Sequence, residues 1–316
     1  MRILITGGGG YIGSYLLNKL SAKHNIICLD HGKRYSELRD IINYNVELVE
    51  GDITDEALLE KILQRDIDVV IHLAGVLGNN ACIKNPIDAV KSHIYSTHML
   101  VQKSLNHKVK QFIFSSTQSV YSTFKKREMP LTENMKLEPD DLYGILKMVS
   151  EYEIRDSDLN YTILRLANVF GHMKELKKFK IGGAIENFIQ AARDGNDITI
   201  FGKGEQKIDY VNIEDVSNCI ENVLGNDSAN NEIFNVGSGS LHSIEEIATI
   251  VSNFSEEFYQ NKINIKKTPA PNGKIWPDRL MSIEKISHKL DWNPSISIQT
   301  GIRDTMKNLG CLIGNT

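Results

Sequence analysis

A run of four glycines near the start of the chain constrains the fold more than any other feature of the sequence. Gly7 to Gly10 follow a short apolar run, Ile3-Leu4-Ile5, and precede a helix-like segment that begins at Tyr11. This order predicts a buried strand, a tight turn and the start of a helix. The run also belongs to a G-x-G-x-x-G pattern that ends at Gly13, the spacing of a turn that binds a dinucleotide. In such a turn the backbone approaches a pyrophosphate, and N–H groups at the helix start face the phosphates.

A carboxylate ends the second apolar run of the chain. Ile26-Ile27-Cys28-Leu29 leads into Asp30, which lies 17 residues beyond Gly13. A carboxylate near this spacing holds a ribose 2′-hydroxyl and repels a 2′-phosphate, so Asp30 favours NAD over NADP. Lys33 and Arg34 follow closely and oppose that preference. The structural alternative is an aspartate that ends a strand in an ordinary turn.

Segments typical of strands and helices alternate through the first half of the chain. Buried strands are expected at 46–49, 69–71, 112–114 and 161–164, and helices at 55–63, 86–106 and 141–154. This rhythm predicts an α/β fold, a Rossmann-type doubly wound parallel sheet with helices on both faces. Past residue 170 the rhythm breaks, and helices near 183–193, 214–224, 243–253 and 298–308 predict a smaller α/β substrate-binding cap. We therefore expect a NAD-binding part at 1–171, to which the chain returns around 208–236, and a substrate-binding part at 172–316.

Composition argues against several classes of protein. The chain has 316 residues, of which 41% are hydrophobic and 24% charged, as in an ordinary soluble globular protein. The formal net charge of −4 gives no reason to expect a nucleic acid or a membrane as partner. The first strand leaves no room for a signal peptide, and no apolar run approaches the length of a membrane span. The cysteines lie far apart and the histidines show no metal-ligand spacing, so we expect a cytoplasmic protein without disulfide bonds or a metal site.

Ligands of a parallel sheet bind at the carboxyl ends of its strands, so the residues that follow each strand are candidates for the site. Asp52 and its neighbour Ile53 follow the third strand, where Asp52 either contacts an adenine or caps the next helix. His72 follows the fourth strand and is interpreted as a structural histidine. The residues Leu73-Ala74-Gly75 come next, and their small members allow a cofactor to lie across the strand ends.

Hydroxyl groups follow the fifth strand, and a tyrosine–lysine pair lies on the helix after it. The segment 115–119, Ser-Ser-Thr-Gln-Ser, is either a place to hold a substrate hydroxyl or a serine-rich turn. Tyr143 and Lys147 are four residues apart and so share one helix face. A lysine beside a phenol favours the phenolate and lowers its pKa, which makes Tyr143 a candidate general base near neutral pH. The pair is weak evidence alone, but it gains weight from the glycine turn and Asp30.

Together, these motifs resemble the extended short-chain dehydrogenase/reductase family, in its NAD-dependent nucleotide-sugar epimerase/dehydratase branch, over nearly the whole chain. The family's T-G-x-x-G-x-x-G pattern runs from Thr6 to Gly13, and its H-x-A-A pattern is similar to residues 72–75. Its Ser/Thr before a Val-Tyr pair is Thr117, and its Y-x-x-x-K pair is Tyr143 and Lys147. Further matches are 164–171, which is similar to L-R-x-x-N-V-Y-G, the segments 202–206, 209–211 and 214–216, and Leu290-Asp291-Trp292-Asn293-Pro294.

The resemblance implies a role for each matched residue. Thr117 would bind the reacting sugar hydroxyl, Tyr143 would take its proton, and Lys147 would bind the nicotinamide ribose. Asn168 would hold the sugar or its pyrophosphate. The residues expected to bind NAD are Gly7, Gly10, Tyr11, Ile12, Gly13, Asp30, Asp52, Ile53, Leu73, Ala74, Gly75, Tyr143 and Lys147.

Three departures from the family pattern carry information. Gln118-Ser119 stands where the family's 4,6-dehydratases have Asp-Glu and where its decarboxylases have a glutamate in place of the serine, so both of these chemistries are disfavoured. His93 stands where the family has an asparagine. Ile208 stands where the family has an arginine that grips the diphosphate, so another cation must serve. The candidates are Arg279, Lys178 and Lys180, and the two lysines belong to a lysine-rich loop that is otherwise a solvated surface.

The combined pattern predicts a NAD-dependent epimerase that acts on a nucleoside-diphosphate sugar through a transient keto intermediate. An NAD(P)-dependent sugar dehydrogenase or ketoreductase remains an alternative, as does a non-catalytic NAD-binding protein on the same fold. The resemblance also implies a homodimer, in which the helices at 86–106 and 141–156 pair with their copies. The apolar stripe of the first helix fits such an interface, although it equally fits the side that faces the sheet; it comprises Ile87, Val90, Ile94, Thr97 and Val101.

Overall fold

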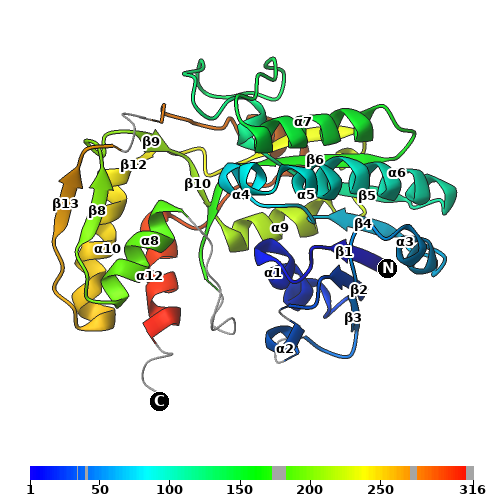
Figure 1. Cartoon of the computed structure of the whole chain (residues 1–316), viewed down its shortest axis with the longest axis horizontal. Coiled ribbons are helices and arrows are strands. Elements are labelled where there is room, and N and C mark those ends of the chain that lie inside the picture. Colours follow the sequence, from blue (N-terminus) through cyan, green and yellow to red (C-terminus); the bar gives the residue numbers. More distant parts are fainter. Residues whose placement is uncertain (34, 40–41, 173–182, 271–275, 311–316) are drawn as a thin grey trace.

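A seven-stranded parallel sheet forms the centre of the larger part of the molecule (Figure 1). The structure is a computed structural model, and it describes residues 1–316 except 34, 40–41, 173–182, 271–275 and 311–316. The strand order is β11-β6-β5-β4-β1-β2-β3, so the direction of winding reverses between β1 and β4. A ligand crevice forms at such a point, outside the carboxyl ends of the strands. The strands are β1 (Arg2–Thr6), β2 (Asn25–Asp30), β3 (Val46–Glu50), β4 (Val69–His72), β5 (Gln111–Thr117), β6 (Tyr161–Leu166) and β11 (Glu232–Val236).

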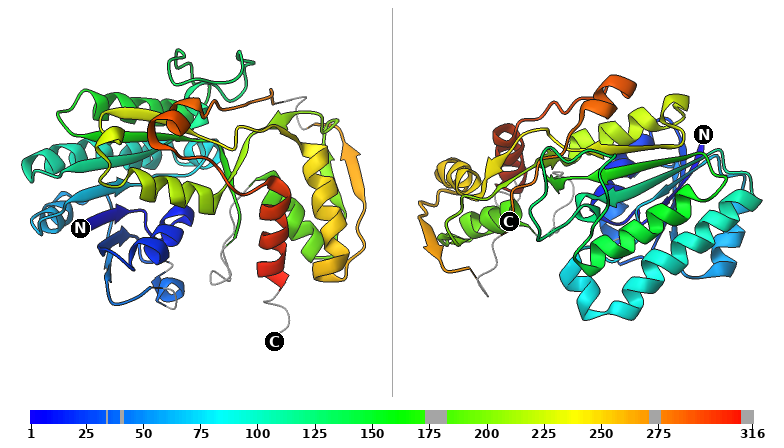
Figure 2. Two further views of the ribbon diagram at one scale, coloured as in Figure 1. Left: turned by 180° about the vertical axis from the view of Figure 1, so that it is seen from behind. Right: turned by 90° about the horizontal axis from the view of Figure 1, so that it is seen from above.

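Helices cover both faces of this sheet (Figure 2). On one face α1 (Tyr11–Leu20) packs beside α9 (Ile213–Val223). On the other face α6 (Ser96–Asn106) contacts both α3 (Glu56–Leu63) and α7 (Leu142–Arg155). Each layer buries its own apolar cluster against the sheet, because successive residues of a strand point to opposite faces. The doubly wound α/β fold is therefore confirmed. Within the described ranges, no helix combines the length and the apolar character that crossing a bilayer requires.

The second half of the chain builds a smaller α/β unit beside the large sheet (Figure 1). Its helices α8 (Ala184–Arg193), α10 (Ile244–Tyr259) and α12 (Ile298–Gly310) enclose a separate apolar cluster. Between α8 and α10 the chain returns to the large sheet through α9 and through β11, which pairs with β6. The remaining elements are α2 (Tyr35–Leu38), α11 (Glu284–Leu290), the parallel pairs β8 (Ile198–Phe201) with β13 (Ile265–Thr268) and β7 (Asn168–Phe170) with β10 (Tyr210–Asn212), and the antiparallel pair β9 (Lys207–Ile208) with β12 (His242–Ser243).

The helix expected at 86–106 is divided into segments. It comprises α5 (Pro86–Val90), a π-helical turn at Lys91–Tyr95 and α6, and it is preceded by a separate helix, α4 (Asn79–Lys84). The wider π turn shifts the residues after it around the helix axis, so a count at a spacing of 3.6 fails across it. Ile87 and Val90 are consequently exposed, whereas Thr97 and Val101 are buried. The predicted single apolar stripe is therefore wrong: its first half faces outward and its second half faces the protein interior.

A buried ion pair attaches α7 to the sheet. Arg165 of β6 and Glu151 of α7 are both about 1% exposed, and Arg165 Nη2 lies 2.7 Å from Glu151 Oε2. Arg165 Nε also donates to Glu151 Oε1 at 3.0 Å, and the Ser116 hydroxyl donates to the same carboxylate. Arg165 Nη1 donates to the phenolic oxygen of Tyr121 at 2.9 Å. The pair thereby joins the end of β5, the strand β6 and the helix that carries Tyr143.

Replacing Glu151 by glutamine is expected to lower the free energy of unfolding by roughly 3–5 kcal/mol, because the Arg165 charge then remains buried without its counter-ion. Urea denaturation of both proteins measures the difference. The matched control is Glu47→Gln, which breaks an exposed pair with Arg65 and should cost no more than about 1 kcal/mol. Equal, small losses for the two variants would contradict the role given to the Arg165–Glu151 pair.

Candidate active site

Two adjoining cavities lie over the carboxyl ends of the central strands. The larger, of about 1270 Å³, extends past the ends of β2 and β3, and the smaller, of about 500 Å³, lies over the end of β5 and the start of α7. Both are lined by Gly7, Gly10 and Tyr11, so they meet at the glycine turn. This is the place where the reversal of strand order puts a ligand crevice.

The glycine turn leaves no room for side chains. A Cβ on Gly7, whose φ is +70°, would lie 2.8 Å from the backbone nitrogen of Ala74, and one on Gly13 would lie 2.5 Å from the carbonyl oxygen of Gly7. Helix α1 begins after Gly10 with no side-chain cap and with no acidic residue in its first turn. Backbone without side chains and the positive end of a helix dipole therefore face the cavity. These are the features that bind the pyrophosphate of a dinucleotide.

Asp30 lies in the larger cavity and also holds the glycine turn. Its carboxylate accepts hydrogen bonds from the backbone N–H groups of Gly9 at 3.0 Å and of His31 at 2.8 Å. A carboxylate can accept further bonds, so these two leave capacity for a ribose hydroxyl. Lys33 lines the same cavity, whereas Arg34 lies outside the described residues.

Asp52 and Ile53 line the larger cavity beyond Asp30. Asp52 Oδ1 accepts hydrogen bonds from the N–H and the hydroxyl of Thr54, at 2.8 and 2.7 Å. Helix α3 is capped by Asp55 instead, which accepts from the Leu58 N–H. Asp52 therefore closes the turn ahead of the helix, and its place in the wall remains compatible with an adenine contact.

His72 is a structural histidine, as the sequence predicted. It is fully buried, and its two ring nitrogens lie 2.7 Å from the Thr6 hydroxyl and 3.0 Å from the Thr97 hydroxyl. Burial holds its pKa well below the ordinary value, so the ring stays neutral.

The smaller cavity brings together Thr117, Tyr143 and Lys147. Thr117 Oγ1 accepts a hydrogen bond from the Ser119 N–H at 3.2 Å, so the threonine hydroxyl keeps its own proton to donate. Lys147 Nζ donates to the carbonyl oxygen of Ser115 at 2.7 Å and lies 4.6 Å from the centre of the Phe114 ring. These contacts fix the ammonium group at the end of β5.

The expected effect of Lys147 on Tyr143 is not what the structure shows. Burial raises the pKa of the Tyr143 phenol above its ordinary value, and nearby Cys82 and Asp141 raise it further. Burial also lowers the pKa of Lys147 to about 8. The prediction that Lys147 lowers the pKa of the Tyr143 phenol is therefore wrong, because removal from water disfavours the charged forms of both groups.

His93 and Gly75 are matched to each other. The His93 ring is buried on the π-helical turn, and one of its nitrogens lies 2.9 Å from the carbonyl oxygen of Val76. Its ring packs edge-on against Tyr143, with the ring centres 5.8 Å apart. A Cβ on Gly75 would lie 2.5 Å from His93 Cε1. The glycine in place of the family's second alanine is thus required by the histidine in place of the family's asparagine.

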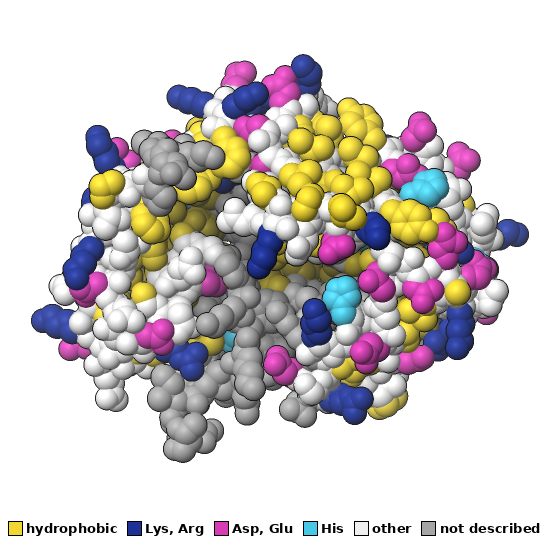
Figure 3. Space-filling model, in the orientation of Figure 1, with side chains coloured by type: hydrophobic (Ala, Val, Ile, Leu, Met, Phe, Trp, Pro, Cys, Tyr) yellow, Lys and Arg dark blue, Asp and Glu magenta, His cyan; other side chains and the backbone are white. Residues whose placement is uncertain are grey.

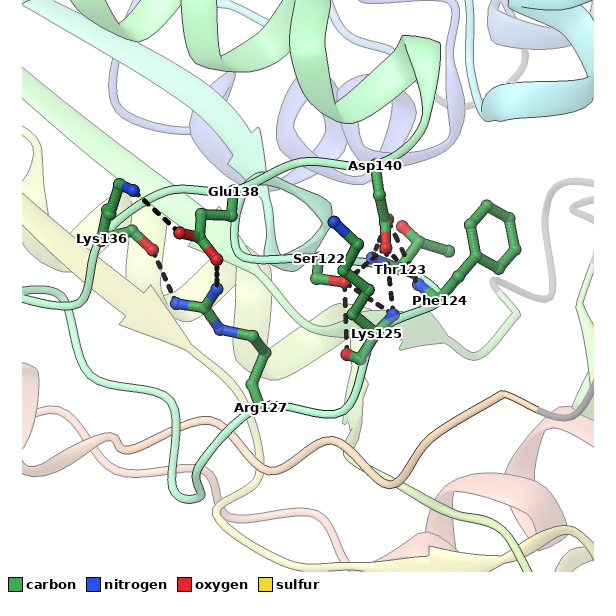
Figure 4. Close-up of polar contacts among 8 residues, drawn as sticks. All are labelled: Ser122, Thr123, Phe124, Lys125, Arg127, Lys136, Glu138 and Asp140. Carbon is green, nitrogen blue, oxygen red and sulfur yellow. Dashed lines mark hydrogen bonds and ion pairs between the residues drawn. The ribbon is translucent and has the colours of Figure 1, made fainter.

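The loop between β5 and α7 is held by its own carboxylates (Figure 4). Asp140 accepts hydrogen bonds from the hydroxyl of Ser122 and from the backbone N–H groups of Thr123, Phe124 and Lys125. Burial favours the neutral acid, but these bonds together hold the pKa of Asp140 below its ordinary value. Glu138 pairs with Arg127 further along the loop. Asp141, which follows Asp140, caps α7 by accepting a hydrogen bond from the Gly144 N–H at 2.7 Å. The loop therefore fixes where the helix that carries Tyr143 begins.

The remaining predicted residues lie on the side of the smaller unit. Asn168 of β7 and Arg279 line the smaller cavity. Arg279 forms an isolated parallel bridge with Ile208, the position at which the family arginine is missing. Lys178 and Lys180 lie outside the described residues. Glu186, which no sequence pattern had singled out, lines the same cavity on the first turn of α8.

Comparison with known proteins agrees with this geometry. A family model described as the NAD dependent epimerase/dehydratase family matches residues 3–237. The chain belongs to this family. A Methanocaldococcus jannaschii protein, provisionally named a UDP-glucose 4-epimerase, is 30% identical over 97% of this chain and 98% of its own length.

Two solved structures resemble the chain over almost its whole length. The UDP-glucose 4-epimerase of Thermotoga maritima, solved with UDP-glucose, is 28% identical, with a TM-score of 0.86 over 99% of this chain and 100% of that chain. The UDP-glucuronic acid 4-epimerase of Bacillus cereus, solved with UDP-glucuronic acid and NAD, is 26% identical, with a TM-score of 0.84 over 99% and 100%.

The family to which the chain belongs is NAD-dependent. Among the residues that the structure describes, no group of three or more His, Cys, Asp or Glu side chains is arranged to hold a metal ion. The uncapped helix α1, the crowded glycines and Asp30 fit a bound NAD.

The close contact between Gly75 and His93 predicts that Gly75→Ala and Gly78→Ala lower the free energy of unfolding by unequal amounts. Gly75→Ala is expected to lower the free energy of unfolding by roughly 2–4 kcal/mol, since a positive φ and a clash with the His93 ring add together. Gly78→Ala is the control, because Gly78 also has a positive φ but nothing lies within 4 Å of its added Cβ. Thermal and urea denaturation measure both. Replacing His93 by alanine should reduce the Gly75→Ala cost to that of Gly78→Ala, and equal costs in the wild-type background would contradict the pairing.

Proposed function

We propose that the protein is a NAD-dependent epimerase that inverts a carbon of a nucleoside-diphosphate sugar through a transient keto intermediate. The observation that carries the proposal is the content of the smaller cavity. Thr117, Tyr143 and Lys147 converge there, and the positions after Thr117 hold Gln118 and Ser119, neither of which can donate or accept a proton as a carboxylic acid does. Without an acid to expel water, and without the decarboxylase glutamate, a keto sugar can only be reduced again or released.

Each residue has a task in this scheme. Thr117 donates its hydroxyl proton to the oxygen of the reacting sugar hydroxyl and so holds it beside Tyr143. The phenolate of Tyr143 takes the proton of that hydroxyl, and the phenol returns it when the keto group is reduced. Lys147, fixed by Ser115, binds the nicotinamide ribose and adds a positive charge beside the phenol. Bound NAD would supply the hydride acceptor, the returning hydride and the positive nicotinamide charge that favours the phenolate.

The substrate and the cofactor are held by different walls of the site. The glycine turn, Asp30 and the strand-end residues 73–75 would hold NAD, with the 2′-hydroxyl of the adenosine ribose on Asp30. Asn168 would hold the sugar or its pyrophosphate. Arg279 would replace the missing arginine at Ile208 as the group that binds the diphosphate, since it lies in the adjacent backbone position.

The test is incubation of the protein with UDP-, GDP-, CDP- and dTDP-sugars without added cofactor, followed by mass spectrometry and NMR of the products. An epimerase gives a product of unchanged mass and altered sugar stereochemistry, with no net NADH. Loss of water or carbon dioxide, or NADH that accumulates in proportion to product, would refute the proposal in favour of a dehydratase, a decarboxylase or a dehydrogenase. Mass spectrometry of small molecules released from the purified protein would identify the resident dinucleotide.

Tyr143→Phe is expected to abolish turnover while the fold and the bound NAD are retained, because only the phenolic oxygen is removed. The control is Tyr152→Phe, the same change at an exposed tyrosine of the same helix, 55% exposed, which should leave turnover unchanged. Rates on the best substrate of the panel and NAD content after gel filtration are measured for each. Turnover near the wild-type rate in Tyr143→Phe would exclude it as the base.

We also infer a homodimer that buries an exposed apolar surface. Side chains on α4, α5 and α7 make up this surface, and yellow hydrophobic groups gather over these helices in Figure 3. Its members are Ile83, Ile87, Val90, Ile145 and Tyr152, each at least 41% exposed. Burying such a surface against a second copy would remove apolar area from water.

The cysteines support a reducing, cytoplasmic location, because Cys28, Cys82 and Cys219 are buried and form no disulfide bond.

Light scattering at micromolar concentration should therefore report twice the mass of the chain. Ile87→Glu should yield a monomer, because a buried unpaired charge opposes association. Phe201→Glu is the control, at an exposed aromatic residue of the smaller unit, and should leave the dimer intact. A wild-type protein that scatters as a monomer would refute the homodimer.

A further inference from the structure

The carboxyl group of Glu186 is only partly satisfied by the protein. Its Oε2 lies over the start of α8, where a Cβ on Gly183 would be 2.9 Å away. Its Oε1 is buried and accepts no hydrogen bond. A buried carboxyl oxygen without a donor is unfavourable, and such an atom in the wall of a ligand cavity points to a donor that the ligand supplies.

Arg279 presents the complementary case in the same cavity. The residue is 8% exposed, and its Nε–H is buried without an acceptor. No carboxylate of the described residues forms an ion pair with it, although a buried guanidinium without an anion is costly. An anionic group of a ligand would satisfy it.

These two groups act on one stretch of the cavity wall. Tyr210 lines the same cavity as both groups, and its pKa responds to both: burial raises the pKa of the phenol, Glu186 raises it further and Arg279 lowers it. Glu186 and Arg279 form no ion pair with each other, although both line this cavity. A ligand that carries both an anionic group and hydrogen-bond donors would engage both.

We propose that Glu186 is a further substrate-binding residue, which accepts hydrogen bonds from hydroxyl or N–H groups of the nucleoside-diphosphate sugar whose diphosphate Arg279 binds. This inference rests on the proposed function and extends it to a residue that no motif identifies. The donors lie either on the nucleoside or on the sugar, and both sources present the same chemistry to the carboxylate.

A purely structural role explains the position of only one of the two carboxyl oxygens of Glu186. Glu186 occupies the third position of α8, where a glutamate commonly reaches back to the backbone at the helix start. That role explains the place of Oε2 near Gly183. It leaves Oε1 without a partner, and a glutamine would perform it equally well.

The charge of Glu186 gives the proposal a second measurable consequence. Burial raises its pKa to about 7. The phenols of Tyr11 and Tyr210 interact electrostatically with Glu186. Burial raises both of their pKa values, so they stay neutral, while Arg279 stays charged. Donors favour the ionised carboxylate, so substrate binding below pH 7 releases a proton, and the affinity rises as the pH rises through 7.

The test is calorimetric titration of the NAD-loaded protein with UDP-glucose and with UDP. Glu186→Gln, which keeps the reach to the helix start but removes the charge, should weaken binding by roughly ten- to one-hundred-fold. Glu256→Gln, the same change at an exposed residue of α10, should leave it unchanged. Melting temperatures of the variants should match that of the wild type. The wild-type affinity for UDP-glucose should rise by up to about tenfold from pH 6 to pH 8, and the Glu186→Gln affinity should not.

Weakened binding of both ligands in Glu186→Gln would locate the donors on the nucleotide, and weakened binding of UDP-glucose alone would locate them on the sugar. Either result supports the proposal. Wild-type affinity for both ligands in Glu186→Gln, or a pH dependence that survives the substitution, would overturn it while leaving the epimerase proposal intact. A wild-type protein that binds neither ligand would instead refute a UDP-sugar as substrate, and the role of Glu186 with it.

Discussion

The position of the helix that carries Tyr143 depends on the buried ion pair between Arg165 and Glu151. Taking two charges out of water is costly, and the pair is tolerated because the arginine and the carboxylate share several bonds and because Ser116 and Tyr121 satisfy further polar atoms. Tyr121 in turn donates to Asn235 Oδ1 at 2.8 Å, so the network extends to β11. Three strands and α7 are therefore fixed relative to one another. Removing one member would leave the others buried and unpaired, so the whole network holds the helix that carries Tyr143 in its position.

Burial then sets the protonation states of Tyr143, Lys147 and His93. The same removal from water raises the pKa of Tyr143, lowers that of Lys147 to about 8 and lowers that of His93 to about 4. At neutral pH these three residues thus provide a neutral phenol, a neutral imidazole and one ammonium group. Little water screens charges in this buried region, so an added charge interacts strongly with these three side chains. A positive charge brought into this part of the cavity would therefore lower the pKa of the Tyr143 phenol.

The sequence predicted those parts of the fold and site that depend on local patterns. Glycine spacing, a carboxylate after the second strand and an i,i+4 tyrosine–lysine pair are all short-range signals, and each residue lies at the strand end or helix face expected for it. The missed features leave no signal in short-range patterns of residue types. A π turn at Lys91–Tyr95 leaves no mark in a count of apolar residues, and nothing in the local sequence says that Gly75 must be small because His93 fills its space. The unpartnered oxygen of Glu186 likewise becomes visible only when its surroundings are known.

Ile208 shows how a single departure from a family pattern can mislead when its neighbour in space is unknown. In the sequence, the isoleucine removes a cation from the segment that should bind a diphosphate. In the structure, Arg279 bridges to Ile208 through backbone hydrogen bonds on both sides of the paired residues. The backbone of Arg279 thus runs directly beside that of Ile208, so an arginine at 279 starts close to the place from which one at 208 would start. The isoleucine side chain meanwhile packs into the apolar cluster of the smaller unit. The wall of the cavity therefore keeps one arginine, although a different segment of the chain supplies it.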